Sequence, residues 1–135
     1  MARVNPKGIA AIAAAGLTLC SGVLYTFLGK WEPGKNAGVV YADTLAGGIP
    51  TVCKGLTHWT TDTPIIVGEV WSDAKCEREE KQAIAAVQSE LIFCFNLNAK
   101  VPQSVFDMAT SHAWNFGYLK TCASQAMQAL SLIHI

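Results

Sequence analysis

The chain has 135 residues, which is enough for one domain and a short appended segment. Ten Lys and Arg residues balance ten Asp and Glu residues, and the net charge of zero excludes a nucleic-acid-binding protein that relies on a basic surface. Hydrophobic residues make up 51% of the chain and charged residues only 15%, which is unusual for a small cytosolic domain.

The N-terminal stretch Gly8–Leu28 holds no charged residue over 21 positions, long enough to cross a bilayer as one helix. Arg3 and Lys7 precede it, which predicts a cytoplasmic N-terminus and an exported remainder. A cleaved signal peptide is the alternative, but no small-residue cleavage site follows Leu28. We therefore predict an inner-membrane anchor in residues 1–29, with the following domain in the periplasm, tethered or released. The anchor is weak, because eight of the 21 residues are Gly or Ala.

Five cysteines are present, and Cys20 lies within the apolar stretch. Export to an oxidising compartment permits disulfides, and three connectivities are open to the remaining four cysteines: Cys53, Cys76, Cys94 and Cys122. None of these four is separated from another by two residues, as zinc-binding pairs are. The spacing favours a disulfide framework with no metal, and no cofactor is expected.

A small β-hairpin is predicted after the apolar stretch. Pro33 and Gly34 end the first helix, because Pro cannot continue it. Val39–Tyr41 reads as a strand, and Gly47-Gly48 supplies a turn. Residues 49–54 form the return strand, with Pro50 marking an edge position. Residues 57–70 are predicted to be an irregular loop.

The C-terminal half reads as helical. Ser72 is a plausible N-cap for a helix that reaches about Phe95, with one apolar face formed by Ile84, Val87, Leu91 and Cys94. Pro102 opens a second helix to about Phe116, which Gly117 stops; its predicted inward side is Val105, Met108, Ala109 and His112. A third helix is expected to start near Thr121. The order predicts an α+β fold in which an N-terminal membrane helix leads into a small β-hairpin lobe and a helical lobe.

Glu32 and Asp43 are the two carboxyl groups that flank the start of the hairpin. Glu32 follows an apolar helix, a setting that desolvates a carboxyl and raises its pKa, whereas Asp43 lies in a polar stretch. Glycosidic hydrolysis needs such a pair, one protonated to donate to the leaving oxygen and one ionised. On spacing alone, two unrelated surface carboxylates are the better interpretation.

The chain resembles the phage-type lysozymes, glycoside hydrolase family 24, in three stretches. Residues 31–57 contain Trp31-Glu32, Tyr41-Ala-Asp43 and Gly48-Ile-Pro-Thr51-Val-Cys-Lys-Gly55-Leu-Thr57, which is similar to the active-site signature of that family. Residues 105–117, ending in Asn115-Phe-Gly117, resemble the helix that lines the family's cleft. Residues 8–28 resemble the signal-anchor-release segment of membrane-tethered endolysins.

The resemblance implies a lysozyme that hydrolyses the β-1,4 bond between N-acetylmuramic acid and N-acetylglucosamine in peptidoglycan during phage-mediated lysis. Glu32 is then the general acid, Asp43 positions or activates water, and Thr51 helps to hold that water. Asn115, His112 and Trp59 are expected to contact substrate. A helix-packing role is the alternative for His112, and a satisfied loop pair with His58 is the alternative for Trp59.

Two spacings depart from the family pattern. Ten residues separate Glu32 from Asp43 and seven separate Asp43 from Thr51, two more in each case than is usual. A longer hairpin with Gly47-Gly48 at its tip is predicted to absorb them. Leu56 stands where many members have His, so a polar contact is expected to be lost there.

The last six residues, 130–135, read Leu-Ser-Leu-Ile-His-Ile, as one reading frame of a sequencing-library transposon end would encode. We interpret them as an artefactual tail after a catalytic domain at 30–129 whose C-terminal part is missing, and a natural apolar tail is the alternative. Such a fragment is expected to have little activity. We expect a monomer that acts on peptidoglycan and touches the membrane through residues 8–28. A non-catalytic, membrane-anchored, disulfide-stapled cell-wall-binding module is the second functional hypothesis.

Overall fold

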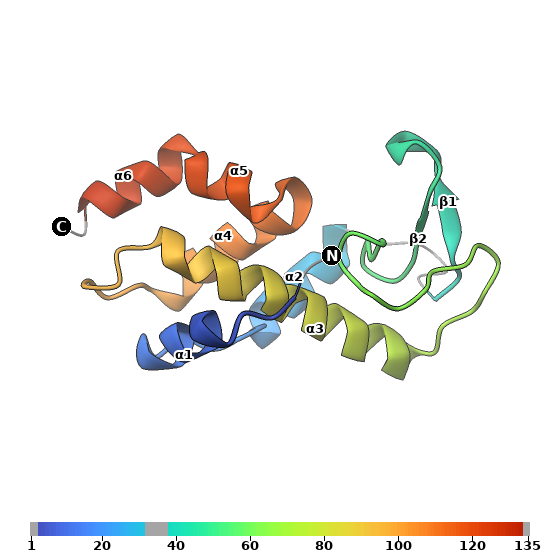
Figure 1. Cartoon of the computed structure of the whole chain (residues 1–135), viewed down its shortest axis with the longest axis horizontal. Coiled ribbons are helices and arrows are strands. Elements are labelled where there is room, and N and C mark those ends of the chain that lie inside the picture. The colour runs from blue at the N-terminus through green and yellow to red at the C-terminus, as the bar shows by residue number, and fades with distance from the viewer. Residues whose placement is uncertain (1–2, 32–37, 134–135) are drawn as a thin grey trace. The chain divides into compact units, whose positions relative to one another are not determined.

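The computed structural model describes residues 3–31 and 38–133, which form helices and one small sheet (Figure 1). The elements are α1 (Pro6–Ala14), α2 (Gly22–Trp31), β1 (Tyr41–Asp43), the 3-10 helix η1 (Thr44–Ala46), β2 (Ile49–Thr51), α3 (Asp73–Leu91), the 3-10 helix η2 (Ile92–Cys94), α4 (Gln103–Phe116), α5 (Tyr118–Ala123) and α6 (Gln125–Ile133). Two compact units result, a hairpin unit centred on Thr26–Ala83 and a helical unit built from residues 4–25 and 84–133. A mixed helical chain with one antiparallel sheet confirms the α+β class.

The prediction of one continuous helix across Gly8–Leu28 is wrong. α1 ends at Ala14 and α2 begins at Gly22. Between them Gly16 has a φ of 72° and Cys20 a φ of 41°, left-handed values that a right-handed helix does not contain. Among the residues that the structure describes, no helix combines the length and the apolar character needed to cross a membrane.

Side chains from α3 and α4 hold this break in place. The Gln88 amide oxygen accepts the Cys20 backbone N–H at 2.8 Å, and the Gln103 amide oxygen accepts the Thr18 N–H at 2.8 Å. Both groups would otherwise lack a helical partner, because the chain leaves α1 before them. The connection therefore has a defined path.

The apolar N-terminal residues belong to the core of the helical unit. Ile12 is 1% exposed and packs in one cluster with Leu91, Ile92 and Phe106. Gly8 is needed for close approach, because a Cβ built on it would lie 1.7 Å from the carbonyl oxygen of Ser89. The low charge of this stretch thus reflects burial against α3, η2 and α4 in the present structure.

The predicted hairpin is confirmed with a shifted first strand and a shorter return strand, because β2 ends at Thr51 and not at Lys54. β1 starts at Tyr41, two residues after the predicted start, because Val39 pairs instead with Val70 in an isolated bridge. Tyr41 pairs with Thr51 and Asp43 with Ile49. Gly47 and Gly48 both have positive φ, so the predicted turn lies at the tip. Pro50 is tolerated because both strands of a two-stranded sheet are edges.

The helices of the C-terminal half are largely as predicted. The Ser72 hydroxyl accepts the Lys75 N–H at 3.1 Å, which confirms the N-cap of α3. α4 ends before Gly117 as expected, but α5 starts at Tyr118, earlier than predicted. The predicted face of α4 is wrong at Met108, which is 73% exposed, and at His112, which is also exposed, while Phe106, Ala109 and Ala113 point inward.

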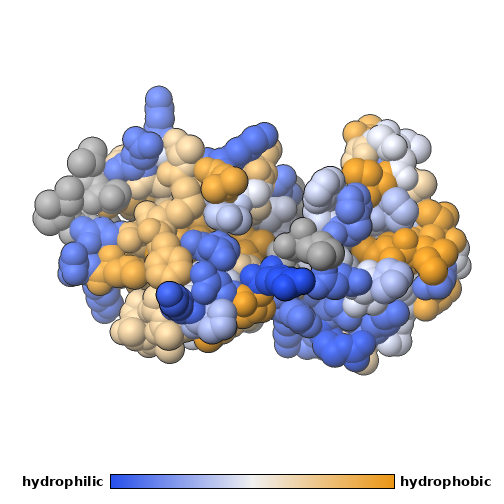
Figure 2. All heavy atoms as spheres, viewed as in Figure 1, coloured by the Kyte–Doolittle hydropathy of each residue, from blue (hydrophilic) through white to orange (hydrophobic). Residues whose placement is uncertain are grey.

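Residues 130–133 continue α6, and Leu130 packs against the helical core. Exposed large apolar side chains occur in both units, and Figure 2 shows hydrophobic surface over both. Only some of the many hydrophobic side chains are therefore buried in the described part of the chain.

Replacing Ile12 with Ala is expected to lower the free energy of unfolding by about 2–5 kcal/mol, because it leaves a cavity in the helical core. Val23→Ala, at a position that is 77% exposed, is the matched control and should change it by less than about 0.5 kcal/mol. Urea denaturation followed by circular dichroism measures both. Equal stability of the two variants would show that α1 is not part of the folded core.

Candidate functional site

Glu32, the predicted general acid, lies outside the residues that the structure describes. α2 ends at Trp31, one residue before it. The described part of the candidate site is therefore the hairpin, the loop that follows it and the first half of α3.

Asp43 and Thr51 lie on the same face of the hairpin. Thr51 is the partner of Tyr41, and Asp43 lies two residues further along β1, so the two side chains are diagonal neighbours. Such neighbours in an antiparallel pair are roughly 7–8 Å apart at Cα, a span that one water molecule bridges between two polar side chains. The register of the two strands thus places Asp43 and Thr51, two of the three predicted catalytic residues, close together on one face.

The two side chains have different surroundings. The carboxylate of Asp43 is half-buried and accepts the backbone N–H of Leu45 at 3.0 Å, which caps η1. Thr51 is 3% exposed, and its hydroxyl donates to the carbonyl of Ile49 at 3.0 Å. The carboxylate keeps free lone pairs, and the hydroxyl oxygen keeps its acceptor capacity for a further partner.

The tip of the hairpin absorbs the extra residues between Asp43 and Thr51. η1 and two left-handed glycines, Gly47 and Gly48, fill the connection, and the Gly48 N–H donates to the carbonyl of Asp43 at 2.7 Å. The pairing of β1 with β2 is undisturbed as a result. The other long spacing, between Glu32 and Asp43, falls partly outside the described residues.

The turn after Thr51 is fastened to α3 at two points. Cys53, whose φ of 57° is left-handed, forms a disulfide with Cys76. One residue later the Lys54 N–H donates at 2.8 Å to the carboxylate of Glu80, which is 2% exposed. Cys76 and Glu80 are four residues apart and share a helix face.

Sequence reasoning missed Glu80, because it looked like one more charge on an exposed segment. Its spacing from Cys76 was the available signal, and it acquires meaning only once the disulfide is known. Of the three possible connectivities, the structure has Cys53–Cys76 and Cys94–Cys122.

Trp59 projects from the loop that follows the hairpin. It is 63% exposed, and its ring lies 4.4 Å from that of His58. Two hydrogen bonds fix the turn beneath it, from the Thr57 N–H to the Thr60 hydroxyl and from the Trp59 N–H to the Thr57 hydroxyl. The structure therefore presents a large aromatic surface on a well-defined turn.

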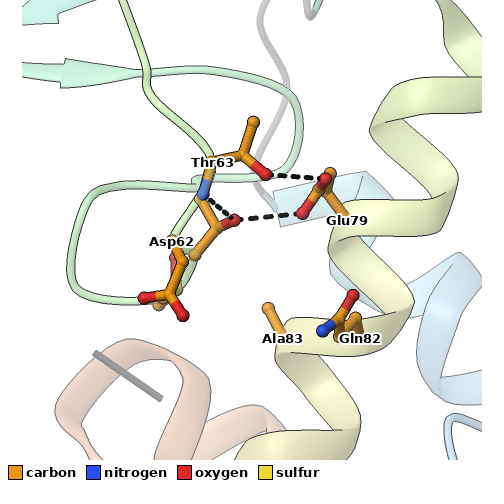
Figure 3. Close-up of a pocket in the computed structure, with 7 residues that line it drawn as sticks. Asp62, Thr63, Glu79, Gln82 and Ala83 are labelled. Carbon is orange, nitrogen blue, oxygen red and sulfur yellow. Dashed lines mark hydrogen bonds between the residues drawn. The ribbon is translucent and has the colours of Figure 1, made fainter. Parts of the chain in front are cut away.

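A polar cavity of about 100 Å³ separates this loop from α3 (Figure 3). The Glu79 carboxylate accepts the hydroxyls of Thr61 and Thr63 at 3.0 and 2.8 Å, which ties the loop to the helix. The volume corresponds to about three water molecules and is too small for a sugar ring. The hydrogen bonds to Glu79 beside this cavity anchor the loop to α3. Its lining residues are Thr60, Thr61, Asp62, Thr63, Glu79, Gln82 and Ala83.

His112 and Asn115 belong to the helical unit. His112 Nδ1 lies 2.8 Å from the Thr121 hydroxyl, and its ring packs 4.7 Å from that of Phe116. This arrangement fits the helix-packing alternative. The Asn115 amide donates to the carbonyl of Ser111 at 3.0 Å and is exposed.

In the part of the chain that the structure describes, no three His, Cys, Asp or Glu side chains lie close enough together to bind a metal ion.

The model of the phage lysozyme family matches residues 35–133. The chain belongs to the phage lysozyme family. The match includes Asp43, Thr51 and Trp59 and begins after Glu32. None of the curated proteins compared with the chain matches it. Membership confirms the lysozyme resemblance seen in the sequence and gives the protein a glycoside hydrolase type of activity on peptidoglycan.

Glu79→Ala is expected to loosen the loop, because it removes the carboxylate that two threonine hydroxyls share. Hydrogen bonds to a charged group contribute about 1.5–3 kcal/mol, so exchange of the Thr63 backbone amide should speed up at least about tenfold. Gln82→Ala, in the same cavity wall without that contact, is the control. Hydrogen exchange measured by NMR distinguishes them, and unchanged exchange in Glu79→Ala would contradict the anchoring role.

Proposed function

We propose that the protein is an endolysin that hydrolyses the β-1,4 bond between N-acetylmuramic acid and N-acetylglucosamine during phage-mediated lysis of the host. Family membership supports the reaction type. The shared hairpin face of Asp43 and Thr51 is the observation that carries the assignment of the site.

In this mechanism Glu32, protonated, donates its proton to the glycosidic oxygen as the bond to the sugar breaks. The ionised carboxylate of Asp43 stabilises the positive charge that develops on the sugar or accepts a proton from the attacking water. Thr51 completes the water position, because its hydroxyl oxygen can accept from a water that also donates to Asp43. The balance closes when the water oxygen bonds to the anomeric carbon, the proton of that water leaves to solvent by way of Asp43, and Glu32 is reprotonated from solvent.

Substrate contacts are assigned to Trp59, Asn115 and His112. An exposed indole on a braced turn offers the flat apolar face on which a sugar ring stacks. Asn115 is exposed and has amide groups for sugar hydroxyls or acetamido groups. His112 is the weakest member, since Thr121 and Phe116 already occupy its ring.

Peptidoglycan lies outside the cytoplasm, so the proposal includes export. Arg3 and Lys7 before the uncharged residues 8–28 support an N-terminal segment that directs export of the enzyme. Two disulfides favour the same oxidising compartment.

Glu32→Gln is expected to abolish release of soluble muropeptides from purified Gram-negative sacculi, because the amide has no proton to donate to the leaving oxygen. Glu69→Gln, at an exposed carboxyl in the same unit, is the control and should release them at the wild-type rate. Mass spectrometry of the products should show reducing-end N-acetylmuramic acid. Reducing-end N-acetylglucosamine would assign a different bond, and equal release by wild type and Glu32→Gln would favour a cell-wall-binding module.

Thr51→Val keeps the shape of the side chain and removes the hydroxyl. We expect the rate of muropeptide release to fall by about 10–100-fold, because the water loses one of its fixed partners. Thr44→Val, four positions before Gly48 on the exposed tip, is the control and should retain the rate. A Thr51→Val rate within twofold of wild type would remove Thr51 from the site.

A further inference from the structure

Glu80 is a buried carboxylate that the proposed mechanism does not use. It is 2% exposed, and burying a charged group is costly unless its hydrogen bonds are made. In the fold its carboxylate accepts the backbone N–H of Lys54 at 2.8 Å. A charged acceptor on a single turn of main chain holds that turn more tightly than a neutral one.

The turn that contains Lys54 follows β2, and the Lys54 side chain lies against α2. Thr51 is three residues earlier in the chain, and the intervening Cys53 is locked to α3 by its disulfide. The side chain of Lys54 crosses Gly29 in the last turn of α2, where a built Cβ would lie only 2.9 Å from the Lys54 Cε. A cation at the C-terminal end of a helix is favoured by the helix dipole.

These contacts connect the turn that follows Thr51 with the last turn of α2. α2 leads to Glu32, and the turn after β2 follows Thr51. All the contacting residues belong to the hairpin unit, so the connection does not depend on the placement of the helical unit.

We propose that Glu80 is a positioning residue for the hydrolytic reaction, acting through Lys54 to fix Thr51 relative to the end of α2. The inference rests on the proposed function. Glu80 touches no reacting atom. Its carboxylate sets the main chain at Lys54, and the aliphatic part of Lys54 then packs on a position that glycine leaves open.

The test compares four variants of the full chain in muropeptide release from sacculi. Glu80→Ala should lower kcat by about 10–100-fold with apparent KM within about twofold, because misplacement of catalytic groups costs rate more than binding. Glu80→Gln keeps an acceptor oxygen and should retain kcat within about threefold. Glu77→Gln, on the exposed face of the same helix, is the control and should have the kcat of the wild-type protein.

Gly29→Ala tests the same connection from the side of α2, and it remains informative if Glu80→Ala does not fold. Alanine favours a helix over glycine, so Tm should hold or rise, while the added methyl displaces the Lys54 side chain. We expect kcat to fall severalfold, a loss that a purely structural role of Lys54 would not produce.

Wild-type kcat in folded Glu80→Ala would overturn the inference, and so would wild-type kcat in Gly29→Ala. Equal losses in Glu80→Ala and Glu80→Gln would also overturn it, because the acceptor oxygen would then be irrelevant. Absence of muropeptide release by the wild-type chain is a different result, and it counts against the proposed function itself.

Discussion

The attachment of the hairpin and its following loop to one face of α3 is the constraint on which the candidate site depends. A two-stranded sheet of three residues per strand has little stability alone. Cys76, Glu79 and Glu80 supply the attachment by three different means: a disulfide, a carboxylate shared by two hydroxyls and a carboxylate on a backbone N–H. Their spacing of three and four residues puts them on adjacent rows of the helix.

Carboxylates in this unit therefore have different roles. Glu79 accepts two threonine hydroxyls and Glu80 accepts a backbone N–H, whereas Asp43 is half-buried and accepts the Leu45 N–H at the hairpin tip. Glu77, on the exposed side of α3, differs again: a hydrogen bond from Lys81 and the charge of Lys81 lower its pKa, and the charge of Lys54 adds to this. Acidic residues on one helix can thus have unrelated roles, decided by which face they occupy.

The N-terminal apolar stretch shows how composition permits two outcomes. Small and aliphatic residues without charge suit a bilayer, and they also suit a tightly packed protein core. In the structure Gly8 allows α1 to approach Ser89 closely, and Ile12 fills the cluster beneath η2. The side chains of Gln88 and Gln103 bind the main chain where the helix breaks. These hydrogen bonds form only when the N-terminal residues pack against α3 and α4.

The sequence by itself determined the features that depend on neighbours in the chain. Periodicity and caps located α3 and α4, Gly47-Gly48 located the hairpin turn, and the residues around Asp43 and Thr51 indicated a phage lysozyme. Tertiary structure alone decided the break between α1 and α2, the choice among three disulfide patterns, the inward face of α4 and the role of Glu80. Each of these is an interaction between residues distant in sequence, and local propensity contains no information about which distant partner will satisfy a buried group.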